Sequence, residues 1–333
     1  MALTTNRGIT IKGIVNVVPR TVEDNLELAL LDSKEREALI LHTGIRFRRV
    51  ADSSHTILAY FNKAVDQLLQ RTGWSKADVD ILLCVTQSPN MVIPSVSCRL
   101  HGDMGFDNKT MCYDINSGCS GFVYGLHTIS SLLQTIDGKH KKAILVCGDL
   151  STHLIDSEDK SVRPIFSDAV SAIAIECSSE DQKISGYFNL GTDGTGQHAI
   201  EIDHEDGQGY MKLNGIDVFG YSVQRVPRNI TDLLSFANRE TDFADLLVMH
   251  QANKVINESI RKKLNVDEVK VPYSIYEYGN TASASIPITL SKAWDSYQPQ
   301  SGWILIAGFG VGFSMASGLI KFEPNFCDKP IEF

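Results

Sequence analysis

The sequence predicts an α/β protein, and three observations lead to this fold class. Near-continuous apolar runs such as Ile-Leu-Leu-Cys-Val and Ala-Ile-Leu-Val-Cys-Gly recur along the chain, as is typical of strands buried on both faces of a sheet. Amphipathic helical patterns lie between these runs. The two halves also resemble each other, since Asp80-Ile-Leu-Leu-Cys-Val is echoed by Asp245-Leu-Leu-Val-Met-His. We therefore expect a duplicated α/β core.

Runs rich in Val, Ile and Leu predict ten strands in two sets of five. The first set is Ile9–Val18, Asp80–Gln87, Met111–Asn116, Ala143–Gly148 and Val170–Cys177, and the second is Ile184–Leu190, Leu246–His250, Val269–Ile275, Trp303–Gly308 and Ser314–Phe322. The turn-rich stretch Ser178–Lys183 separates the two sets. We therefore divide the chain into an N-terminal half, residues 1–178, and a C-terminal half, residues 179–333.

Three helices follow from apolar residues at helical spacing. They are His55–Arg71, which ends before Gly73, then Ser120–Thr135, and Asn253–Leu264. A fourth, built of small residues, should follow the Gly279-Asn280 turn and end near Pro287. The stretch Gly191–Gly209 is rich in Gly, Asp and His, and we expect it to be a surface loop.

Composition excludes several classes of protein. The 333 residues are 43% hydrophobic and carry a formal net charge of −9, so we expect a large core and no nucleic-acid partner. No run of about 18 apolar residues is present, and the first residues lack a secretory pattern. We expect a cytoplasmic protein with no membrane partner. The seven cysteines show no Cys-x-x-Cys spacing, which argues against disulfides and a metal site and favours buried thiols.

Cys119 is the exception among these thiols. The segment Asn116-Ser-Gly-Cys119-Ser-Gly joins a strand to an amphipathic helix through a tight turn, which is also where a strand–turn–helix elbow places a nucleophilic serine. At a helix N-terminus the macrodipole and unpaired amides favour thiolate over thiol. Cys119 is therefore a candidate nucleophile, although a buried structural thiol remains an alternative.

Three further segments could complete a site. His250 ends a buried strand, where α/β proteins place functional residues; it could equally be a core histidine. Asn280 could donate a hydrogen bond or simply suit a turn. The segment Gly308-Phe-Gly-Val-Gly-Phe-Ser314 is followed by no helix, so it fails as a dinucleotide loop and fits a tight hairpin that offers backbone N–H groups to an oxyanion.

Cys, His and Asn together indicate thiol acyl chemistry. Papain-like proteases use the same residues in the same order, but their nucleophile signature is absent here. The chain instead resembles β-ketoacyl-acyl-carrier-protein synthase III, a condensing enzyme of the thiolase superfamily, over nearly its whole length. The resemblance rests on the following motifs: His42-Thr-Gly-Ile-Arg46, Gly118-Cys-Ser-Gly-Phe122, Phe166-Ser-Asp168, Asp193-Gly194, His250-Gln-Ala-Asn253, Gly279-Asn-Thr-Ala282 and Gly308-Phe-Gly-Val-Gly-Phe313.

This resemblance implies a fold, an assembly and a division of roles. The fold would be a thiolase-like duplicated five-layer αβαβα architecture, and the assembly a homodimer. Cys119 would take an acyl group from a thioester, and the backbone N–H groups of Cys119 and Val311 would form the oxyanion hole. His250 and Asn280 would hold a malonyl-carrier thioester and stabilise its enolate as carbon dioxide leaves, which requires donors and not a second carboxylate base.

Several positions depart from the family pattern, and most of them concern coenzyme A. The Trp and Arg that would grip coenzyme A are Ala38 and His42 here, and two further arginines are Val255 and Lys160. Lysine does not reproduce the stacking and bidentate contacts of arginine. We therefore expect either that acyl groups arrive on the phosphopantetheine of an acyl carrier protein or that the donor is not acetyl-coenzyme A, in a specialised pathway. We expect no bound cofactor, since nothing in the sequence requires a metal, flavin or nicotinamide.

Carrier docking and the acyl pocket can also be assigned from the resemblance. An acidic carrier needs a local basic patch, and Lys254, Arg261, Lys262 and Lys263 follow His250 on one predicted helix. Ile93 replaces a phenylalanine that crosses the dimer and closes the partner's acyl pocket, which implies a longer or branched acyl group. Phe219 and Phe309 would be further pocket walls, or simply core residues.

The leading hypothesis is an acyltransferase that performs a decarboxylative Claisen condensation in fatty-acid-like lipid metabolism. One alternative is a relative that passes the acyl group to an amine or alcohol, such as an amino sugar or natural product. Another is a non-catalytic partner subunit of a heterodimeric synthase. Release of carbon dioxide from a malonyl donor separates the first two hypotheses, and the intact Cys119, His250 and Asn280 argue against the third.

Overall fold

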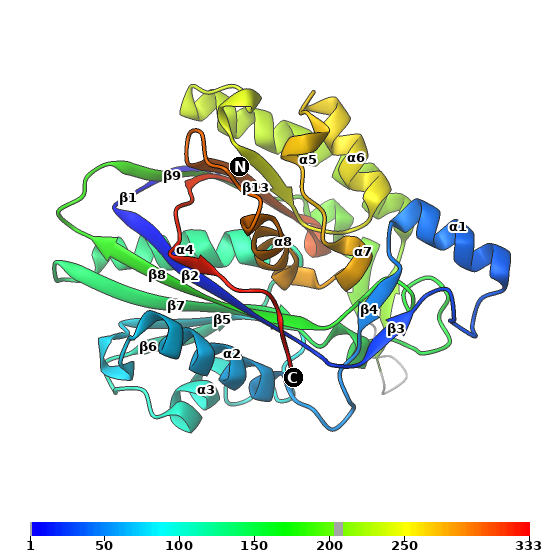
Figure 1. Ribbon diagram of the computed structural model, residues 1–333, viewed down its shortest axis with the longest axis horizontal. Helices are drawn as coiled ribbons and strands as arrows, with labels where there is room; N and C mark the ends of the chain where they lie inside the picture. Colours follow the sequence, from blue (N-terminus) through cyan, green and yellow to red (C-terminus); the bar gives the residue numbers. More distant parts are fainter. Residues whose placement is uncertain (1, 203–208) are drawn as a thin grey trace.

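Two sheets and three helical layers alternate through the molecule (Figure 1). The structure is a computed structural model and describes residues 2–202 and 209–333. From top to bottom in Figure 1, the layers are helices α5 and α6, the five-stranded sheet, helices α4 and α8, the seven-stranded sheet, and helices α2 and α3. The expected five-layer αβαβα architecture is confirmed.

The seven-stranded sheet contains mainly strands of the first half. Its order is β15-β2-β8-β7-β5-β6, with β16 also paired to β2. Its members are β2 (Ile9–Val18), β5 (Ile81–Val85), β6 (Met111–Ile115), β7 (His140–Asp149), β8 (Ala169–Ser178), β15 (Phe326–Cys327) and β16 (Ile331–Glu332). Strand β5 is fully buried, as its unbroken apolar sequence predicts.

The five-stranded sheet contains mainly strands of the second half, in the order β1-β9-β14-β13-β12. They are β1 (Ala2–Arg7), β9 (Ile184–Thr192), β12 (Leu246–Met249), β13 (Trp303–Gly310) and β14 (Ser314–Lys321). Two short ribbons lie outside the sheets: β3 (Val22–Asp24) with β4 (Phe47–Arg49), and β10 (Ile200–Ile202) with β11 (Met211–Leu213). Nine of the ten predicted strands are therefore present.

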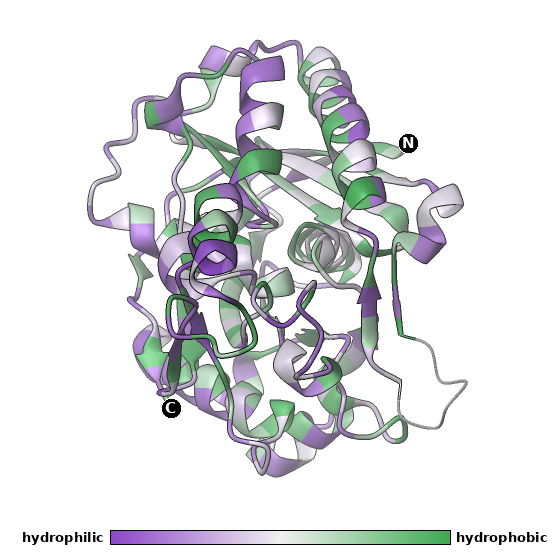
Figure 2. Cartoon of the chain, turned by 90° about the vertical axis from the view of Figure 1, so that its right-hand side faces the viewer, coloured by the Kyte–Doolittle hydropathy of each residue, from purple (hydrophilic) through white to green (hydrophobic). Residues whose placement is uncertain are grey.

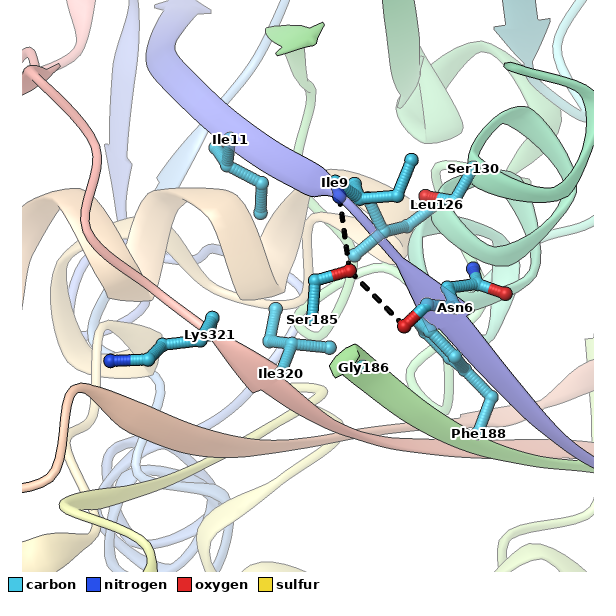
Figure 3. A pocket seen from close by; sticks show the side chains of 10 residues that line it. All are labelled: Asn6, Ile9, Ile11, Leu126, Ser130, Ser185, Gly186, Phe188, Ile320 and Lys321. Atoms are coloured by element: carbon cyan, nitrogen blue, oxygen red, sulfur yellow. Dashed lines mark hydrogen bonds between the residues drawn. The ribbon is translucent and has the colours of Figure 1, made fainter. Parts of the chain in front are cut away.

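The chain termini cross between the halves. Strand β1 pairs with β9 in the second sheet, whereas β15 and β16 pair with β2 in the first. The crossing between β1 and β2 is closed by Ser185, whose hydroxyl accepts a hydrogen bond from the Ile9 amide and donates one to the Asn6 carbonyl (Figure 3). Each half thus contains a strand from the opposite end of the chain.

Eight α-helices cover the sheets in the described residues. They are α1 (Ser33–Thr43), α2 (Ile57–Thr72), α3 (Val96–Met104), α4 (Gly121–Thr135), α5 (Gly215–Ala237), α6 (Lys254–Lys263), α7 (Ile275–Tyr278) and α8 (Ser285–Trp294). The outer helices carry both hydrophilic and hydrophobic residues (Figure 2), as expected where one face meets a sheet and the other meets solvent.

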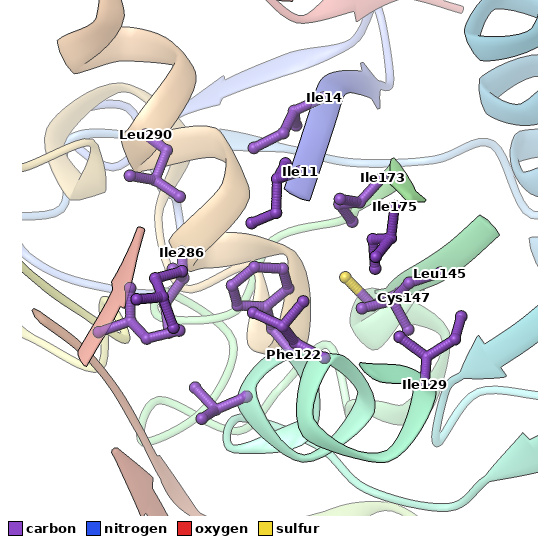
Figure 4. Packing of buried hydrophobic residues seen from close by; sticks show 14 of the residues in the cluster. Ile11, Ile14, Phe122, Ile129, Leu145, Cys147, Ile173, Ile175, Ile286 and Leu290 are labelled. Carbon is purple, nitrogen blue, oxygen red and sulfur yellow. The ribbon is translucent and has the colours of Figure 1, made fainter. Parts of the chain in front are cut away.

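The main core lies between the two sheets, around helices α4 and α8. Phe122 of α4 and Ile286 of α8 are fully buried there, together with Ile11 of β2 (Figure 4). Burying each such side chain stabilises the fold by about 1.5–3 kcal/mol. Because α4 begins directly after Cys119, this core also fixes the position of the candidate nucleophile.

Two local predictions are wrong. Val269–Ile275 is not a strand, because Pro272 has no N–H for a sheet ladder and the Lys270 ammonium binds the carbonyls of Asp242 and Ala244. The small-residue helix does not end near Pro287: α8 begins at Ser285 and places Pro287 in its first turn, where proline is tolerated.

Other predictions concern single residues and loops. In the predicted loop Gly191–Gly209, β9 extends to Thr192, a 3₁₀ turn spans Gly194–Ala199 and β10 follows; residues 203–208 lie outside the described part. Cys98 is exposed and Cys112 half-buried, and the other five thiols are buried. Within the described residues, no helix is long and apolar enough to cross a membrane, and no cluster of acidic, His and Cys side chains could hold a metal.

Candidate active site

Cys119 lies in the turn between the edge strand β6 and helix α4. Ser120 is the N-cap residue of α4, and Cys119 precedes it with only 5% of its surface exposed. The turn is tied to the opposite sheet because the hydroxyls of Ser120 and Ser314 lie 2.6 Å apart. The predicted strand–turn–helix geometry is therefore present at this cysteine.

The protonation state of Cys119 differs from the expectation drawn from the helix dipole. Burial, with a smaller contribution from the nearby Asp149 carboxylate, raises the pKa of the Cys119 thiol to about 12. Desolvation of the thiolate thus outweighs the helix N-terminus in the unliganded chain. Cys119 is a thiol at neutral pH, and its proton must leave during attack on a substrate.

The β13–β14 hairpin packs directly against the nucleophile turn. A Cβ atom on Gly310 would lie 3.0 Å from Cys119 Sγ, and one on Gly308 would lie 3.0 Å from the Cys119 carbonyl oxygen. Glycine is therefore required at both positions for the two backbones to approach. The approach brings Val311, at the tip of the hairpin, beside Gly118: Val311 Cγ2 is 3.6 Å from where a Gly118 Cβ would be.

His250 directly follows strand β12 and is 1% exposed. Burial lowers the pKa of its imidazole to about 3, so the ring is neutral at physiological pH. Its Nδ1 lies 2.8 Å from the Ser285 hydroxyl, which also donates to the Ala282 carbonyl at 2.9 Å. Nε2 is therefore the ring nitrogen available to a substrate.

Asn280 sits on a strained turn beside His250. Its backbone N–H donates to the Ile165 carbonyl and its carbonyl accepts from Ser167 N–H, and its side-chain Oδ1 accepts a hydrogen bond from the Ala282 amide. Because Oδ1 is engaged in this way, the Nδ2 group is left to donate. Asn280 is 5% exposed, so this donor acts in a largely dry environment.

One narrow cavity brings the three candidate residues together. Cys119, His250 and Asn280 all line it, and its volume is about 50 Å³. Its other walls come from the segments around Phe166, Gly215 and Ile256. A thioester that enters this cavity would meet all three side chains.

The predicted pocket residues fall in three different places. Phe309 lines the cavity and meets the His250 ring edge to face, with 5.5 Å between ring centroids. Phe219 lies on the first turn of α5 and is 40% exposed, near the cavity mouth residues Gly215 and Val218. Ile93 is 80% exposed on the loop before α3, so it does not reach the cavity of its own chain.

The predicted docking residues share helix α6, but their charges are not equally available. Lys254 and Lys262 are exposed. The Arg261 guanidinium is bound to the Glu258 carboxylate at 2.8 Å and to the Val266 carbonyl. The Lys263 ammonium donates to the Val223 carbonyl. Arg261 is therefore the one cation of the four that is paired with a carboxylate, and Lys254 and Lys262 have no hydrogen-bond partner within the described residues.

Lys160 and His42, which replace family arginines, are also engaged within the chain. The Lys160 ammonium lies 3.1 Å from the Glu35 carboxylate on α1, and His42 Nδ1 lies 2.6 Å from the Ala38 carbonyl. Val255 is apolar and 41% exposed. No free guanidinium occupies any of these positions.

Ser285 and the segment around Phe166 are site residues that the sequence reasoning did not single out as functional. Ser285 belongs to a run of small residues that resembles any tight helix start. Phe166 was noticed only as part of a motif, and its place in the cavity depends on a bridge to Asn280. Ser285 reaches His250 and Phe166 reaches Asn280 through contacts between segments that lie far apart in the sequence.

Comparison with known proteins agrees with this geometry. Family models described as 3-oxoacyl-[acyl-carrier-protein (ACP)] synthase III and its C-terminal part match residues 113–194 and 234–322. The chain is 33% identical over 317 residues to a beta-ketoacyl-[acyl-carrier-protein] synthase III of Lactobacillus helveticus, covering 91% of this chain and 95% of the relative.

Two solved structures are similar over almost their whole length. A 3-oxoacyl-(acyl-carrier protein) synthase from Burkholderia xenovorans superposes with a TM-score of 0.92 at 28% identity, covering 99% of this chain and 98% of that one. The priming beta-ketosynthase of the R1128 polyketide biosynthetic pathway has a TM-score of 0.86 at 27% identity, covering 97% and 99%.

Proposed function

This chain belongs to the 3-oxoacyl-[acyl-carrier-protein] synthase III family, and from that premise we propose how its residues divide the work of the condensation. The enzyme joins an acyl thioester to malonyl-carrier protein with loss of carbon dioxide. The observation that carries the proposal is the convergence of Cys119, His250 and Asn280 on one narrow cavity.

In the first half-reaction, Cys119 Sγ attacks the thioester carbonyl. The new acyl–sulfur bond forms as the carrier sulfur leaves, and the thiol proton ends on the departing carrier thiol. The tetrahedral oxyanion is held by the backbone N–H groups of Cys119 and Val311, which the packing of Gly310 on Cys119 brings close together.

In the second half-reaction, malonyl-carrier protein loses carbon dioxide and becomes an enolate. The Asn280 Nδ2 group donates to the thioester oxygen that gains negative charge, and His250 Nε2 donates when the Ser285 hydroxyl turns from the Ala282 carbonyl toward Nδ1. The enolate carbon attacks the acyl-Cys119 carbonyl, the sulfur leaves, and the thiolate takes one proton from water.

The acyl donor in this proposal is a carrier-bound thioester and not acetyl-coenzyme A. The family's coenzyme A contacts are replaced by Ala38, His42 and Val255, and the remaining cation, Lys160, is already paired with Glu35. A specialised pathway agrees with this, as in the priming ketosynthase of polyketide synthesis among the structural relatives.

Intact-protein mass spectrometry tests the donor. The protein is incubated with matched acyl-coenzyme A and acyl-carrier thioesters, with Cys119→Ala as control. A mass gain from carrier thioesters alone, absent in Cys119→Ala, is the expected result. Rapid acylation by micromolar acetyl-coenzyme A would contradict the donor assignment. Subsequent release of carbon dioxide from malonyl-carrier protein together with a 3-oxoacyl-carrier product is the expected sign of carbon–carbon bond formation, whereas transfer to an amine or alcohol without carbon dioxide release would overturn this reaction.

Carrier docking is assigned to helix α6, with Lys254 and Lys262 as its exposed cations. Lys262→Glu should raise the KM for carrier-bound substrate and leave the KM for a small pantetheine thioester unchanged. Arg261 and Lys263 already bind groups within the chain, so their replacement should disturb the helix as well. An equal rise in both KM values for Lys262→Glu would place docking elsewhere.

The active form in this proposal is a homodimer. Strand β6 is an unpaired edge of its sheet, and an exposed edge is a ready template for another strand. Next to it, Met91, Val92 and Ile93 are 48%, 90% and 80% exposed. A second copy would cover this apolar loop and bring Ile93 toward the partner's acyl group.

A further inference from the structure

Two carboxamide side chains meet beside the nucleophile turn, on Gln87 and Asn116. Gln87 follows strand β5 and Asn116 follows strand β6, so the parallel pairing of these strands brings them side by side. Gln87 Nε2 donates to Asn116 Oδ1 at 3.1 Å. Neither residue belongs to the cavity that His250 and Asn280 line.

The Gln87 carboxamide lies against the residue that precedes the nucleophile. A Cβ atom on Gly118 would lie 2.2 Å from Gln87 Oε1, and the same point is 3.6 Å from Val311 Cγ2. The carboxamide and Val311 therefore flank Gly118 together. Neither Gln87 nor Val311 lines the cavity that His250 and Asn280 share, and we place the acyl group on their side of the nucleophile turn.

A hydrogen bond to the Asp149 carboxylate fixes the backbone of Gln87. Its backbone N–H donates to the buried Asp149 carboxylate at 2.6 Å, which also accepts from the Thr86 and Ser88 hydroxyls. With the backbone fixed and Nε2 bound to Asn116, the carboxamide has little freedom to turn away. A carboxamide fixed in this way favours an acyl group that can form hydrogen bonds with it.

The pair still has hydrogen-bonding capacity. In the described part of the chain, Gln87 Oε1 accepts no hydrogen bond and Asn116 Nδ2 donates none. Gln87 is half-buried and Asn116 is exposed in the single chain. The adjoining loop, residues 91–93, is the apolar surface assigned above to the dimer. Once a second copy covers this face, an unsatisfied carboxamide would cost free energy unless the substrate pairs with it.

We propose that Gln87 and Asn116 select acyl groups that carry a hydroxyl or amide close to the thioester carbonyl, over saturated acyl groups of the same length. This inference rests on the proposed function, because it needs an acyl group on Cys119. A wholly aliphatic chain would leave the Gln87 Oε1 acceptor and the Asn116 Nδ2 donors facing apolar carbon. A hydroxyl satisfies the Oε1 acceptor of Gln87 and accepts from Asn116 Nδ2.

A competition experiment tests this selectivity. The protein is mixed with equal amounts of 3-hydroxybutanoyl- and butanoyl-carrier thioesters, and the two acyl-Cys119 forms are separated by intact mass. We expect the hydroxylated form to dominate by about tenfold, since a site built to hydrogen-bond a substrate group discriminates against its absence. Gln87→Leu, which keeps the volume and removes the polar atoms, should abolish or reverse the preference.

Two further variants make the result decisive. Asn116→Leu changes an exposed residue, so it keeps the test open if Gln87→Leu fails to fold, and it should reduce the preference in the same direction. Gln70→Leu is the matched control, because Gln70 is exposed on α2 and bonds only Asp66 and Gln67 of the same helix; it should keep the wild-type ratio.

The outcomes separate this inference from the proposed function. If no thioester acylates Cys119, the proposed function fails first. If both thioesters acylate wild-type protein equally, or if Gln87→Leu and Asn116→Leu keep the wild-type ratio, the selectivity assigned to the two carboxamides is wrong.

Discussion

Burial of the Cys119 sulfur controls whether this residue is a thiol or a thiolate. The turn and the helix N-terminus were readable in Gly118-Cys119-Ser120. The desolvation that raises the pKa of the thiol cannot be read from this motif, because it depends on how deeply β13 and α4 bury the sulfur. The structure shows desolvation as the larger influence on the thiol pKa. A local motif identifies a nucleophile but leaves its ionisation to the surrounding fold.

Alkylation of Cys119 by iodoacetamide should therefore be slow at neutral pH and rise steeply with pH. The pKa is raised to about 12, so the thiolate fraction grows about tenfold per pH unit throughout the range below that value. The rate is followed by intact mass in a Cys98→Ser background, because Cys98 is the exposed thiol. A plateau near pH 7 would show that the thiol is already ionised.

Ser285 is expected to matter for one half-reaction only. Its hydroxyl is the group that can hold His250 in the tautomer with a proton on Nε2. Ser285→Ala should slow decarboxylation of malonyl-carrier protein by about tenfold to a hundredfold, the cost of a misdirected catalytic group. Acylation of Cys119 should change less than twofold, since it relies on the oxyanion hole.

The two half-reactions can be measured separately for this variant, carbon dioxide release by a coupled assay and acylation by mass. Equal slowing of both would indicate a general loss of structure and not a loss of tautomer control. The His250→Ala variant provides the limiting case, with decarboxylation stopped and acylation spared.

At the scale of elements, burial on both faces decides which predictions succeed. Strands β5, β7 and β8 have apolar sequences that fit no surface position, and all were predicted. The segment Val269–Ile275 has a similar apolar content but contains Pro272, and Lys270 caps carbonyl groups there. Sequence periodicity alone does not reveal such competing contacts. It also failed to predict helix α5, which carries Pro227 in its interior.

The hairpin between β13 and β14 should be as important as the catalytic side chains. Gly310→Ala would place a methyl group 2.7 Å from Cys119 Cβ, so either the hairpin or the nucleophile must move. We expect acylation to fall about a hundredfold, because displacements of about 1 Å at a reacting centre have effects of that size. Val311 would move with the hairpin and weaken the oxyanion hole as well.

Gly220→Ala is the matched control for that substitution. Gly220 lies within α5, and nothing lies within 4 Å of an added Cβ. Alanine there should raise the free energy of unfolding by about 0.5–1 kcal/mol through helix propensity. Acylation kinetics and thermal unfolding are measured on both variants, and similar acylation losses would show that the Gly310 contact has no special role.

At the scale of the whole molecule, duplication was visible in the sequence but the exchange of terminal strands was not. The echo of Asp80–Val85 in Asp245–His250 reflects equivalent strands of the two sheets. Strands β15 and β16 have two residues each, and β1 is exposed or half-buried at most of its positions, so their sequences carry little periodic signal. Their pairing joins both ends of the chain to the opposite half, which ties Cys119 in one half to His250 and Asn280 in the other.

The dimer should likewise be a condition of the chemistry and not an accessory to it. Wild-type protein should elute with twice the 36.7 kDa chain mass.

The double substitution Val92→Asp and Ile93→Asp places charges on an apolar loop that is 90% and 80% exposed at these positions, so the chain itself should fold while association fails. In the proposed dimer the partner's loop closes the acyl side of Cys119, so the monomer should acylate slowly and without acyl selectivity. Val269→Asp, at another exposed apolar position, should leave both mass and acylation unchanged. Light scattering and acylation rates decide the matter: a wild-type monomer with full activity would show that one chain closes its own acyl site.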